Sequence, residues 1–473
     1  MALALVWLRD DLRLDDQPAL RAAFRQGYAP LPAYVHAPEE AGDWAPGAAS
    51  QAWRARSLAA LDAELRTRGS RLIVLRGPSL DALVALAAAT GAEAAFWCRG
   101  YDTPAEAHDA AVARALRARG LRVEVFNGSQ LVEPWDIATR HGDPYRVFTP
   151  FWSNARDALR LPSAWRAPAC WPAPPAHVDG IGLEALGQPR AGWDGSAAHW
   201  TPGEGGAHAA LRRFIERALD GYTEGRDRPA QPGTSRLSPH LHFGEIAPWR
   251  VVAEVQAAHT PANAGHVDAF LRQLFWREFA CHVLHHFPHS VERNLDPRFD
   301  AFPWAAADES ALAAWRAGRT GVPIVDAGMR ELQHTGWMHN RVRMIVASYL
   351  TKHMRMHWRE GARWFLETLV DADTANNTLG WQWVAGTGAD AAPYFRIFNP
   401  VTQACTFDPD GAYIARWLPE LAALPVPLRF APWQDPVRLR HVAPDYPSRP
   451  LVDLAAGRAA ALAAFHSTVG ARR

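Results

Sequence analysis

The first third of the chain alternates short apolar runs with amphipathic segments. The apolar runs predict β-strands at Leu3–Leu8, Leu31–Val35, Arg71–Arg76, Ala94–Trp97 and Leu121–Phe126. Segments with helical spacing, such as Gln51–Arg68 and Pro104–Arg119, lie between them. This rhythm predicts βαβ units and a Rossmann-like parallel sheet covered by helices. The turn Arg9-Asp10-Asp11-Leu12 after the first strand has no glycine, so ordinary NAD binding at this sheet is disfavoured.

A stretch rich in Pro, Gly and Ala, from about Pro162 to Gly206, separates this region from a helical one. Helical spacing follows over Ala207–Leu219, Val267–His286, Glu309–Arg316, Arg341–His357 and Ala362–Leu369. We therefore predict an α/β domain over residues 1–130, an interdomain linker over 131–205 and an all-helical domain over 206–473.

The composition excludes several classes of protein. The net charge of +1 gives no global attraction to nucleic acid or to an anionic membrane, so DNA binding would need a local basic patch. Four scattered cysteines without a C-x-x-C pair indicate neither a disulfide framework nor a zinc site, and we expect no metal. The N-terminal apolar run stops at Arg9, and no apolar stretch has membrane-spanning length. We expect a soluble, cytoplasmic protein.

The 21 tryptophans are more than packing usually requires. Such a set could stack on bases, line an aromatic cofactor pocket or relay electrons. Each single tryptophan could equally fill the core.

The segment Gly233–His240 offers hydroxyls and backbone donors at a predicted helix start. Ser238 followed by Pro239 is typical of an N-cap with proline at the first helical position. Such a start can bind phosphate, because free N–H groups and the helix dipole favour an anion. A capped helix without a ligand explains the same residues.

Two further segments place polar and aromatic side chains on shared helical faces. Phe270, Gln273, Trp276 and Arg277 share one face, which suits a cavity that stacks a ring and hydrogen-bonds its edges. A partly buried helix with a surface arginine is the alternative. Asn340 and Met344 lie one turn apart with Arg341 and Arg343 beside them, and Asp373, Asn377 and Trp381 are spaced by four after Asp371.

Five long motifs occur in order: GTSRLSPHLHFGE, WREF, GVPIVDAGMRELQHTGWMHNRVRM, VDADTANNTLGWQW and DAAPYFRIFNP. Together with the N-terminal VWLRDDLRLDDQPAL they closely resemble the photolyase/cryptochrome family, and among its members the bacterial cyclobutane pyrimidine dimer photolyases. The resemblance covers essentially the whole chain. It implies an antenna domain, a linker and a helical FAD-binding domain.

The resemblance implies roles for residues around FAD. Residues expected to hold the cofactor are Tyr222, Thr234, Ser235, Arg236, Leu237, Ser238, Arg343, Asp371, Asp373 and Asn377. Arg343 and Asp371 would form a salt bridge beside the isoalloxazine, and Asn377 would face flavin N5, where a neutral amide can accept from N5–H. Trp381, Trp358 and Trp304 match the family's electron-carrying tryptophan chain, with Trp304 one residue out of register.

The resemblance also implies a lesion pocket for DNA damaged by ultraviolet light. Its expected residues are Gln273, Trp276, Arg277, Asn340, Arg341, Met344 and Trp383, with Arg226 on the DNA backbone. Trp276 and Trp383 would wedge against the dimer, which must flip out of the duplex. Gln273 departs from the family's usual glutamate, which predicts retained repair with reduced lesion affinity or quantum yield.

The expected activity is that of a deoxyribodipyrimidine photo-lyase: light-driven electron transfer from reduced FAD splits the dimer and returns without net redox change. Asn340, Met344 and Asn377 favour dimer repair over (6-4) repair or signalling. The alternatives are a cryptochrome-type blue-light photoreceptor and, more distantly, a dark flavin oxidoreductase, which would need an NAD(P)H site. The stretches Glu133–Trp135 and Val147–Trp152 favour methenyltetrahydrofolate as antenna, although Pro104 and Ala105 depart from the enterobacterial folate site. A deazaflavin or an empty antenna pocket stays open. We expect a monomer that acts on UV-damaged DNA.

Overall fold

The structure, a computed structural model, describes residues 1–186, 199–391 and 395–469. The N-terminal region forms a parallel sheet of β1 (Leu3–Leu8), β2 (Ala29–His36), β3 (Ile73–Arg76), β4 (Ala94–Cys98) and β5 (Arg122–Phe126). The strand order is β3-β2-β1-β4-β5. The five predicted strands are confirmed, with ends shifted by one or two residues.

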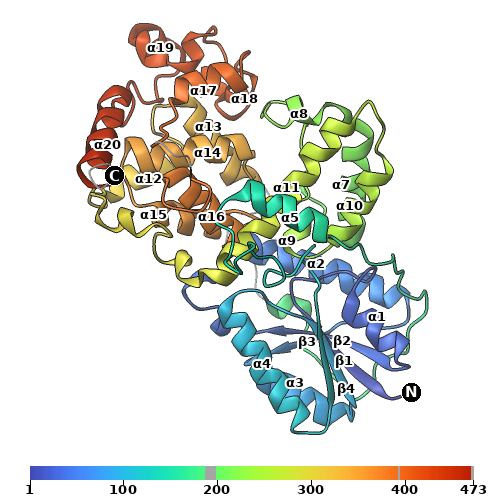
Figure 1. Cartoon of the computed structure of the whole chain (residues 1–473). Helices are drawn as coiled ribbons and strands as arrows, with labels where there is room; N and C mark the ends of the chain where they lie inside the picture. Colours follow the sequence, from blue (N-terminus) through green and yellow to red (C-terminus); the bar gives the residue numbers. More distant parts are fainter. Residues whose placement is uncertain (187–198, 392–394, 470–473) are drawn as a thin grey trace.

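Helices cover both faces of this sheet (Figure 1). Helices α1 (Pro18–Arg25) and α2 (Ala48–Thr67) pack with Val6 and Phe96 on one face. Helices α3 (Ser79–Thr90) and α4 (Thr103–Arg117) pack with Leu5 and Trp97 on the other. Successive residues of a strand point to opposite faces, so strands that are apolar throughout become buried on both sides.

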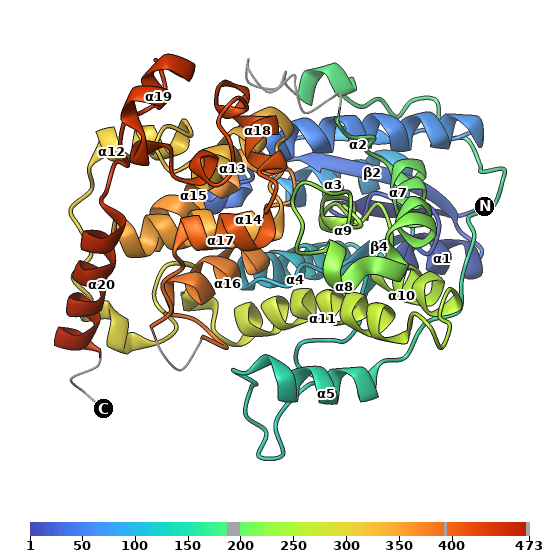
Figure 2. The ribbon, with the colours of Figure 1, turned by 90° about the horizontal axis from the view of Figure 1, so that it is seen from above.

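The predicted linker contains helix α5 (Phe148–Ala158), which packs against helix α11 (Ala264–His286) and lies outside it in Figure 2. After α5 the chain follows the α/β region, where the Ile181 amide donates to the Val74 carbonyl at 2.8 Å. Residues 187–198 of this linker lie outside the described residues. The domain boundaries at 130 and 205 stay predictions.

The C-terminal region is helical, as predicted. Besides α11, its helices are α7 (Glu204–Arg217), α8 (Tyr222–Gly225), α9 (Ser238–His242), α10 (Pro248–Ala257), α12 (Glu309–Arg316), α13 (Pro323–Thr335), α14 (Asn340–Ser348), α15 (Trp358–Thr368), α16 (Thr374–Ala385), α17 (Pro400–Phe407), α18 (Ala412–Trp417), α19 (Pro436–Val442) and α20 (Leu454–Thr468). The helix predicted over Arg341–His357 is wrong in one respect: it is α14 followed by a π-helical turn over Tyr349–His353.

Polar contacts join the two regions. The fully buried Glu245 accepts hydrogen bonds from Trp53 Nε1 at 2.9 Å and from the Gly203 amide at 2.8 Å. At Gly244 (φ +60°), a Cβ would lie 2.3 Å from the Asp10 carbonyl oxygen. Only glycine fits this turn, because both the left-handed backbone and the close approach exclude a side chain. The contacts hold the sheet against the helices that form the candidate site.

Candidate active site

Helix α16 presents the predicted row of Asp373, Asn377 and Trp381. Asp373 is the N-cap, and its Oδ1 accepts from the Asn376 amide at 2.8 Å. Asn377 Nδ2 donates to the Ala362 carbonyl at 2.9 Å. Because the amide nitrogen is bound to the protein, the orientation of Asn377 is fixed and its Oδ1 is left to accept from another group.

The predicted pair of Arg343 and Asp371 is present. Arg343 Nη2 lies 2.9 Å from Asp371 Oδ2, and Arg343 Nε donates to the Met338 carbonyl at 2.7 Å. The Asp371 side chain is only 3% exposed, and its Oδ1 is buried without a partner among the described residues. A buried acceptor without a donor is costly, so this oxygen fits a hydrogen-bond donor from a bound molecule.

The segment from Gly233 to Ser238 passes close to α8. A Cβ on Gly233 would lie 2.3 Å from the Gly225 carbonyl oxygen, so glycine is required there. The backbone N–H groups of Thr234, Ser235 and Arg236 have no acceptor among the described residues. These free donors fit an anion.

The prediction that Ser238 is an N-cap is wrong. Helix α9 begins at Ser238, its cap position is Leu237, and no side chain caps it. The Ser238 hydroxyl accepts from Trp337 Nε1 at 3.2 Å instead. Leu237 and Tyr222 are buried in the same core. A local turn pattern could not reveal that a distant indole engages the serine.

Arg236 lies between two indole rings. Its guanidinium carbon is 4.8 Å from the Trp200 ring centre and 4.5 Å from that of Trp337. No described carboxylate pairs with it, and burial lowers its pKa. Sequence reasoning missed Trp200 and Trp337, although Trp337 stands inside one of the quoted motifs. A planar cation held by stacking, with its N–H groups unpaired, suits a phosphate.

His339 is a third residue that sequence reasoning missed. Its Nδ1 accepts from the Arg341 amide at 3.2 Å, while Nε2 is buried without a partner among the described residues. Burial lowers the pKa of His339 to about 4, so the ring is neutral near pH 7 and carries its proton on Nε2. Its place just before Asn340 is the one sequence signal.

Several residues predicted on the DNA side form polar contacts within the protein. Arg226 Nη2 donates to Gln273 Oε1 at 3.1 Å, and Gln273 Nε2 donates to the Ala269 carbonyl at 3.1 Å. Arg341 Nη2 forms an ion pair with Asp227 Oδ1 at 2.7 Å. Gln273 therefore already uses both ends of its amide within the protein.

The other residues predicted on the DNA side differ in exposure and in contacts. Arg277 donates to the Ser129 carbonyl at 2.6 Å and pairs with Glu278, so it faces the junction with the α/β region. Asn340 is exposed, with Met344 partly buried one turn away. Trp276 and Trp383 are both partly buried.

The three tryptophans of the predicted chain run from core to surface. Trp381 is 2% exposed, and a Cβ on Gly361 would lie 2.0 Å from its indole, so the ring lies directly on α15. Trp358 is fully buried and donates from Nε1 to Asn294 Oδ1 at 2.9 Å. Trp304 is partly buried.

Further aromatic rings contact these three tryptophans. His357 contacts Trp304 at a centroid distance of 5.0 Å and Trp358 at 5.5 Å. Trp315 lies 6.3 Å from Trp381. No spacing pattern indicated either neighbour: His357 adjoins Trp358 in sequence but meets Trp304 only in the folded chain, and Trp315 lies on α12 whereas Trp381 lies on α16.

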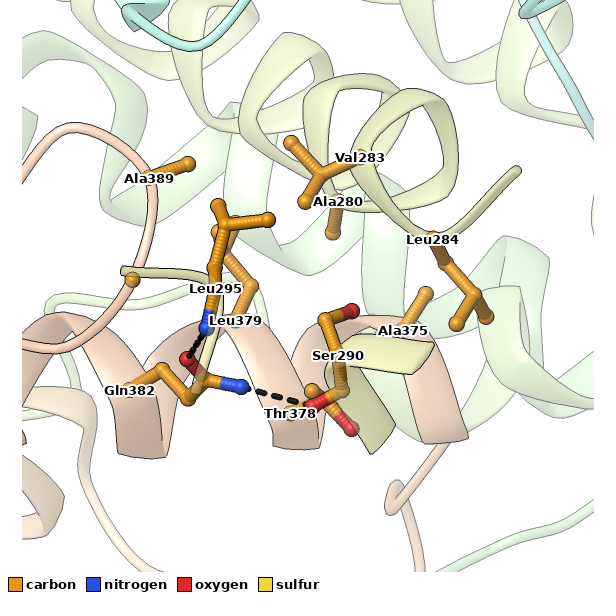
Figure 3. Close-up of a pocket in the computed structure, with 11 residues that line it drawn as sticks. Ala280, Val283, Leu284, Ser290, Leu295, Ala375, Thr378, Leu379, Gln382 and Ala389 are labelled. Carbon is orange, nitrogen blue, oxygen red and sulfur yellow. Dashed lines mark hydrogen bonds between the residues drawn. The ribbon is translucent and has the colours of Figure 1, made fainter. Parts of the chain in front are cut away.

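A small pocket lies on the opposite side of α16, between α11 and the turn Pro288–Val291 (Figure 3). The Gln382 side chain forms part of the wall of this pocket. Its Oε1 accepts from the Leu295 amide at 2.9 Å, and its Nε2 donates to the Ser290 carbonyl at 2.6 Å (Figure 3). With its amide fully used, this pocket offers little to recognise a ligand.

A separate aromatic group lies where β4 and the predicted linker meet α11. Trp135 is 41% exposed, and its ring stacks on Tyr101 at a centroid distance of 6.1 Å and lies 5.4 Å from His285. His285 Nδ1 lies 3.0 Å from Glu106 Oε1. The other stretch quoted for an antenna, Val147–Trp152, instead packs against α11.

Two kinds of feature are absent from the described part of the chain. No helix there is long and apolar enough to cross a membrane. No cluster of three or more metal-ligating side chains occurs within the same residues.

Two family descriptions match the chain. Residues 4–174 match DNA photolyase, and residues 270–467 match the FAD binding domain of DNA photolyase. A parallel-sheet domain joined to a helical FAD-binding domain thus places the chain in the photolyase class of flavoproteins.

Curated relatives and solved structures agree. The chain is 43% identical to a deoxyribodipyrimidine photo-lyase of Agrobacterium fabrum over 98% of both chains, and 38% identical to that of Escherichia coli over 99% of both. It is 38% identical to cryptochrome-1 of Arabidopsis thaliana, over 92% of this chain and 65% of the relative. A bacterial class III photolyase from Agrobacterium tumefaciens superposes with a TM-score of 0.93, over 99% of this chain and 98% of that one, at 43% identity.

The chain belongs to the photolyase/cryptochrome family. The predicted fold, an α/β sheet domain followed by a helical FAD-binding domain, is confirmed, as is the assignment to the photolyase class of enzymes.

Proposed function

We propose that this protein repairs cyclobutane pyrimidine dimers in DNA, using light and reduced FAD. The observation that carries the proposal is a set of polar atoms that have no partner among the described residues. These are Asp371 Oδ1, the amides of Thr234 to Arg236 and the guanidinium of Arg236. Folding leaves such groups unpaired where a ligand completes them.

The residues present fit FAD. The loop amides and Arg236 would bind the diphosphate, since both present donors that form no ion pair with a carboxylate among the described residues. Asp371 and Asp373 would accept hydrogen bonds from the cofactor, and Arg343 holds Asp371 in place. Asn377 Oδ1 would accept a hydrogen bond from the cofactor, because Nδ2 already donates to the Ala362 carbonyl. Bound FAD would supply an electron to the dimer on absorbing light and take it back after the ring bonds break.

The chain's own residues would hold the lesion and keep water out. Trp276 and Trp383 are large apolar rings that can stack on the saturated rings of a dimer. Arg226 and Arg341 would contact phosphates, which gives affinity with little sequence preference. Arg341 first has to exchange Asp227 for a phosphate, so Asp227 moderates non-specific binding.

Trp381, Trp358 and Trp304 would carry an electron inward when the cofactor needs reduction. Trp381 and Trp358 are buried in the core and Trp304 is partly buried, so the row reaches from the core towards the surface. His357 lies between the outer two rings, and its burial-lowered pKa of about 4 keeps it neutral. The neutral His357 ring therefore adds no positive charge beside the row of tryptophans.

For the antenna we propose methenyltetrahydrofolate at the group of Tyr101, Trp135 and His285. The exposed face of Trp135 could stack on a pterin ring, and Arg99 lies 5.2 Å from the same ring. An absorption spectrum of the chromophore released from purified protein would identify it; a deazaflavin spectrum would contradict the proposal.

The direct test of repair is illumination of the purified protein, which we expect to act as a monomer, with an oligonucleotide that carries one dimer. We expect restored pyrimidines in the light and none in a dark control. A flavin spectrum of the same sample reports the cofactor. Loss of all repair with flavin bound and reduced would overturn the proposal.

The second candidate function is a cryptochrome-type photoreceptor. It is favoured by Gln273, whose amide already accepts from Arg226 and donates to Ala269, so that only its second N–H and second lone pair are left for a lesion. Photoreduction without repair in the illumination test would select it.

A further inference from the structure

The lesion-side tryptophan is stacked on a residue of the predicted linker. The rings of Phe148, at the start of α5, and Trp276, on α11, lie 3.8 Å apart between centroids at an interplanar angle of 8°. Phe148 is 1% exposed, whereas Trp276 is partly buried. One face of the indole is therefore covered by Phe148, and part of the ring stays accessible.

A third ring completes this support. Phe279 meets Trp276 edge-on at 5.8 Å and meets Phe148 edge-on at 5.9 Å. The indole thus has a parallel neighbour on one face and a perpendicular neighbour at its side, an arrangement that aromatic rings prefer. A side chain held on two sides loses its alternative rotamers before any ligand arrives.

Phe148 is itself tied down by the segment that follows α16. Its backbone amide donates to Asp390 Oδ1 at 3.1 Å, and the Asp390 amide donates to the Arg146 carbonyl at 2.9 Å. The Arg272 guanidinium lies 5.3 Å from the Phe148 ring centre. The start of α5 is therefore fixed by contacts to two separate parts of the helical region.

We propose that Phe148 is a positioning residue that pre-orders Trp276 for stacking on a flipped-out pyrimidine dimer. The inference rests on the proposed repair function, because that function makes Trp276 a lesion contact. Ordering a side chain on binding costs affinity, so a ring that is already fixed binds about three- to tenfold more tightly. The benefit should appear for the extruded lesion and not for undamaged duplex, which has no reason to enter the pocket.

The test compares Phe148→Leu and Phe148→Tyr with the matched variant Phe151→Leu. Phe151 lies one turn further along α5, is also 1% exposed and packs on Phe279 at 5.2 Å. It shares the burial of Phe148 but contacts Phe279 and His282 rather than Trp276. It therefore controls for a general loosening of α5.

Dissociation constants are measured for a duplex with one dimer and for the same duplex undamaged, together with flavin content. We expect Phe148→Leu to lose about three- to tenfold in dimer affinity with undamaged binding unchanged. Phe148→Tyr should restore it, and Phe151→Leu should keep the preference. Equal loss in Phe151→Leu, or no loss in Phe148→Leu, would overturn the positioning role.

A second measurement needs no DNA. Protein labelled with fluorotryptophan is studied by fluorine NMR, and the Trp276 signal is assigned by its loss in Trp276→Phe. Phe148→Leu should shift this signal because the ring current of a parallel neighbour disappears, while Phe151→Leu should not. An unchanged signal would refute the stack itself. No preference for dimer in the unsubstituted protein, with the stack present, would instead refute the repair function.

Discussion

The two faces of α16 differ in how completely their buried polar side chains are hydrogen-bonded within the protein. On one face Gln382 is 2% exposed and makes hydrogen bonds to Leu295, Ser290, Arg293 and Thr387, all within the protein. On the other face Asn377 uses one end of its amide, and the indole N–H of Trp381 is buried without a partner among the described residues. The closed face stabilises the fold, and the open face keeps hydrogen-bonding groups available for the proposed ligand.

The same contrast appears on α11. Glu278 is 2% exposed and accepts from the amides of Leu131 and Val132, which fixes the chain that leaves the sheet domain. Gln273, on the open side, accepts a hydrogen bond from the partly buried Arg226. Substitutions on closed faces should therefore cost stability, and those on open faces should cost function with little loss of stability.

Gln382→Leu should have the largest effect on stability. It leaves the buried Leu295 amide and two backbone carbonyls without partners, and we expect a loss of about 3 kcal/mol in the free energy of unfolding. Urea unfolding measures the loss. A loss below about 1 kcal/mol would show that water replaces the amide and would break the contrast between the faces.

Trp381→Phe should sharpen the contrast from the other side. We expect most photoreduction of the bound flavin to disappear, because the ring next to the proposed site is no longer readily oxidised. The free energy of unfolding should change by less than about 1.5 kcal/mol, since one aromatic ring replaces another. Flavin absorbance under illumination with an external reductant gives the rate. Trp315→Phe, another fully buried indole, is the control and should keep the rate.

Glu278 makes the closed face sensitive to pH. Burial raises its pKa to about 7, above the unfolded value of 4.5, so the folded chain binds this proton more tightly than the unfolded chain. The free energy of unfolding therefore falls as pH rises through about 7, by about 0.8 kcal/mol between about pH 6.5 and about pH 8. Buried His282, with a pKa lowered to about 4, is neutral throughout this range.

Unfolding of Glu278→Gln over the same pH range checks this assignment. The variant should lose the part of the slope that belongs to Glu278, while the part from Glu204, whose pKa burial also raises to about 7, persists. Identical slopes in the variant and the unsubstituted protein would assign the titration elsewhere.

Gln273→Glu should have the smallest effect. A carboxylate there would turn the hydrogen bond to Arg226 into an ion pair and compete with DNA phosphate for it. We expect the salt dependence of binding to undamaged DNA to weaken by about one phosphate contact. Lesion affinity or repair yield should rise, because a carboxylate accepts more strongly. Unchanged affinity and yield would remove Gln273 from the specificity of the site.

Local patterns were sufficient where the information is local. Apolar runs predicted the five strands, because a buried parallel strand must be apolar on both faces. Spacing by four predicted that Asp373, Asn377 and Trp381 share a face of α16, because the helical repeat is fixed by backbone geometry. The family motifs supplied the pairing of Arg343 with Asp371, which no spacing rule contains.

The sequence by itself determined the order of the elements, the class of each domain and the family. Only the tertiary structure decided that Ser238 binds Trp337 instead of capping a helix, that Arg236 lies between two indoles, and that Phe148 stacks on Trp276. The reason is the separation along the chain over which each kind of interaction acts. Backbone propensity and periodicity act over a few residues, whereas these contacts join side chains from helices and turns far apart in the chain, and their geometry exists only after the whole core has packed.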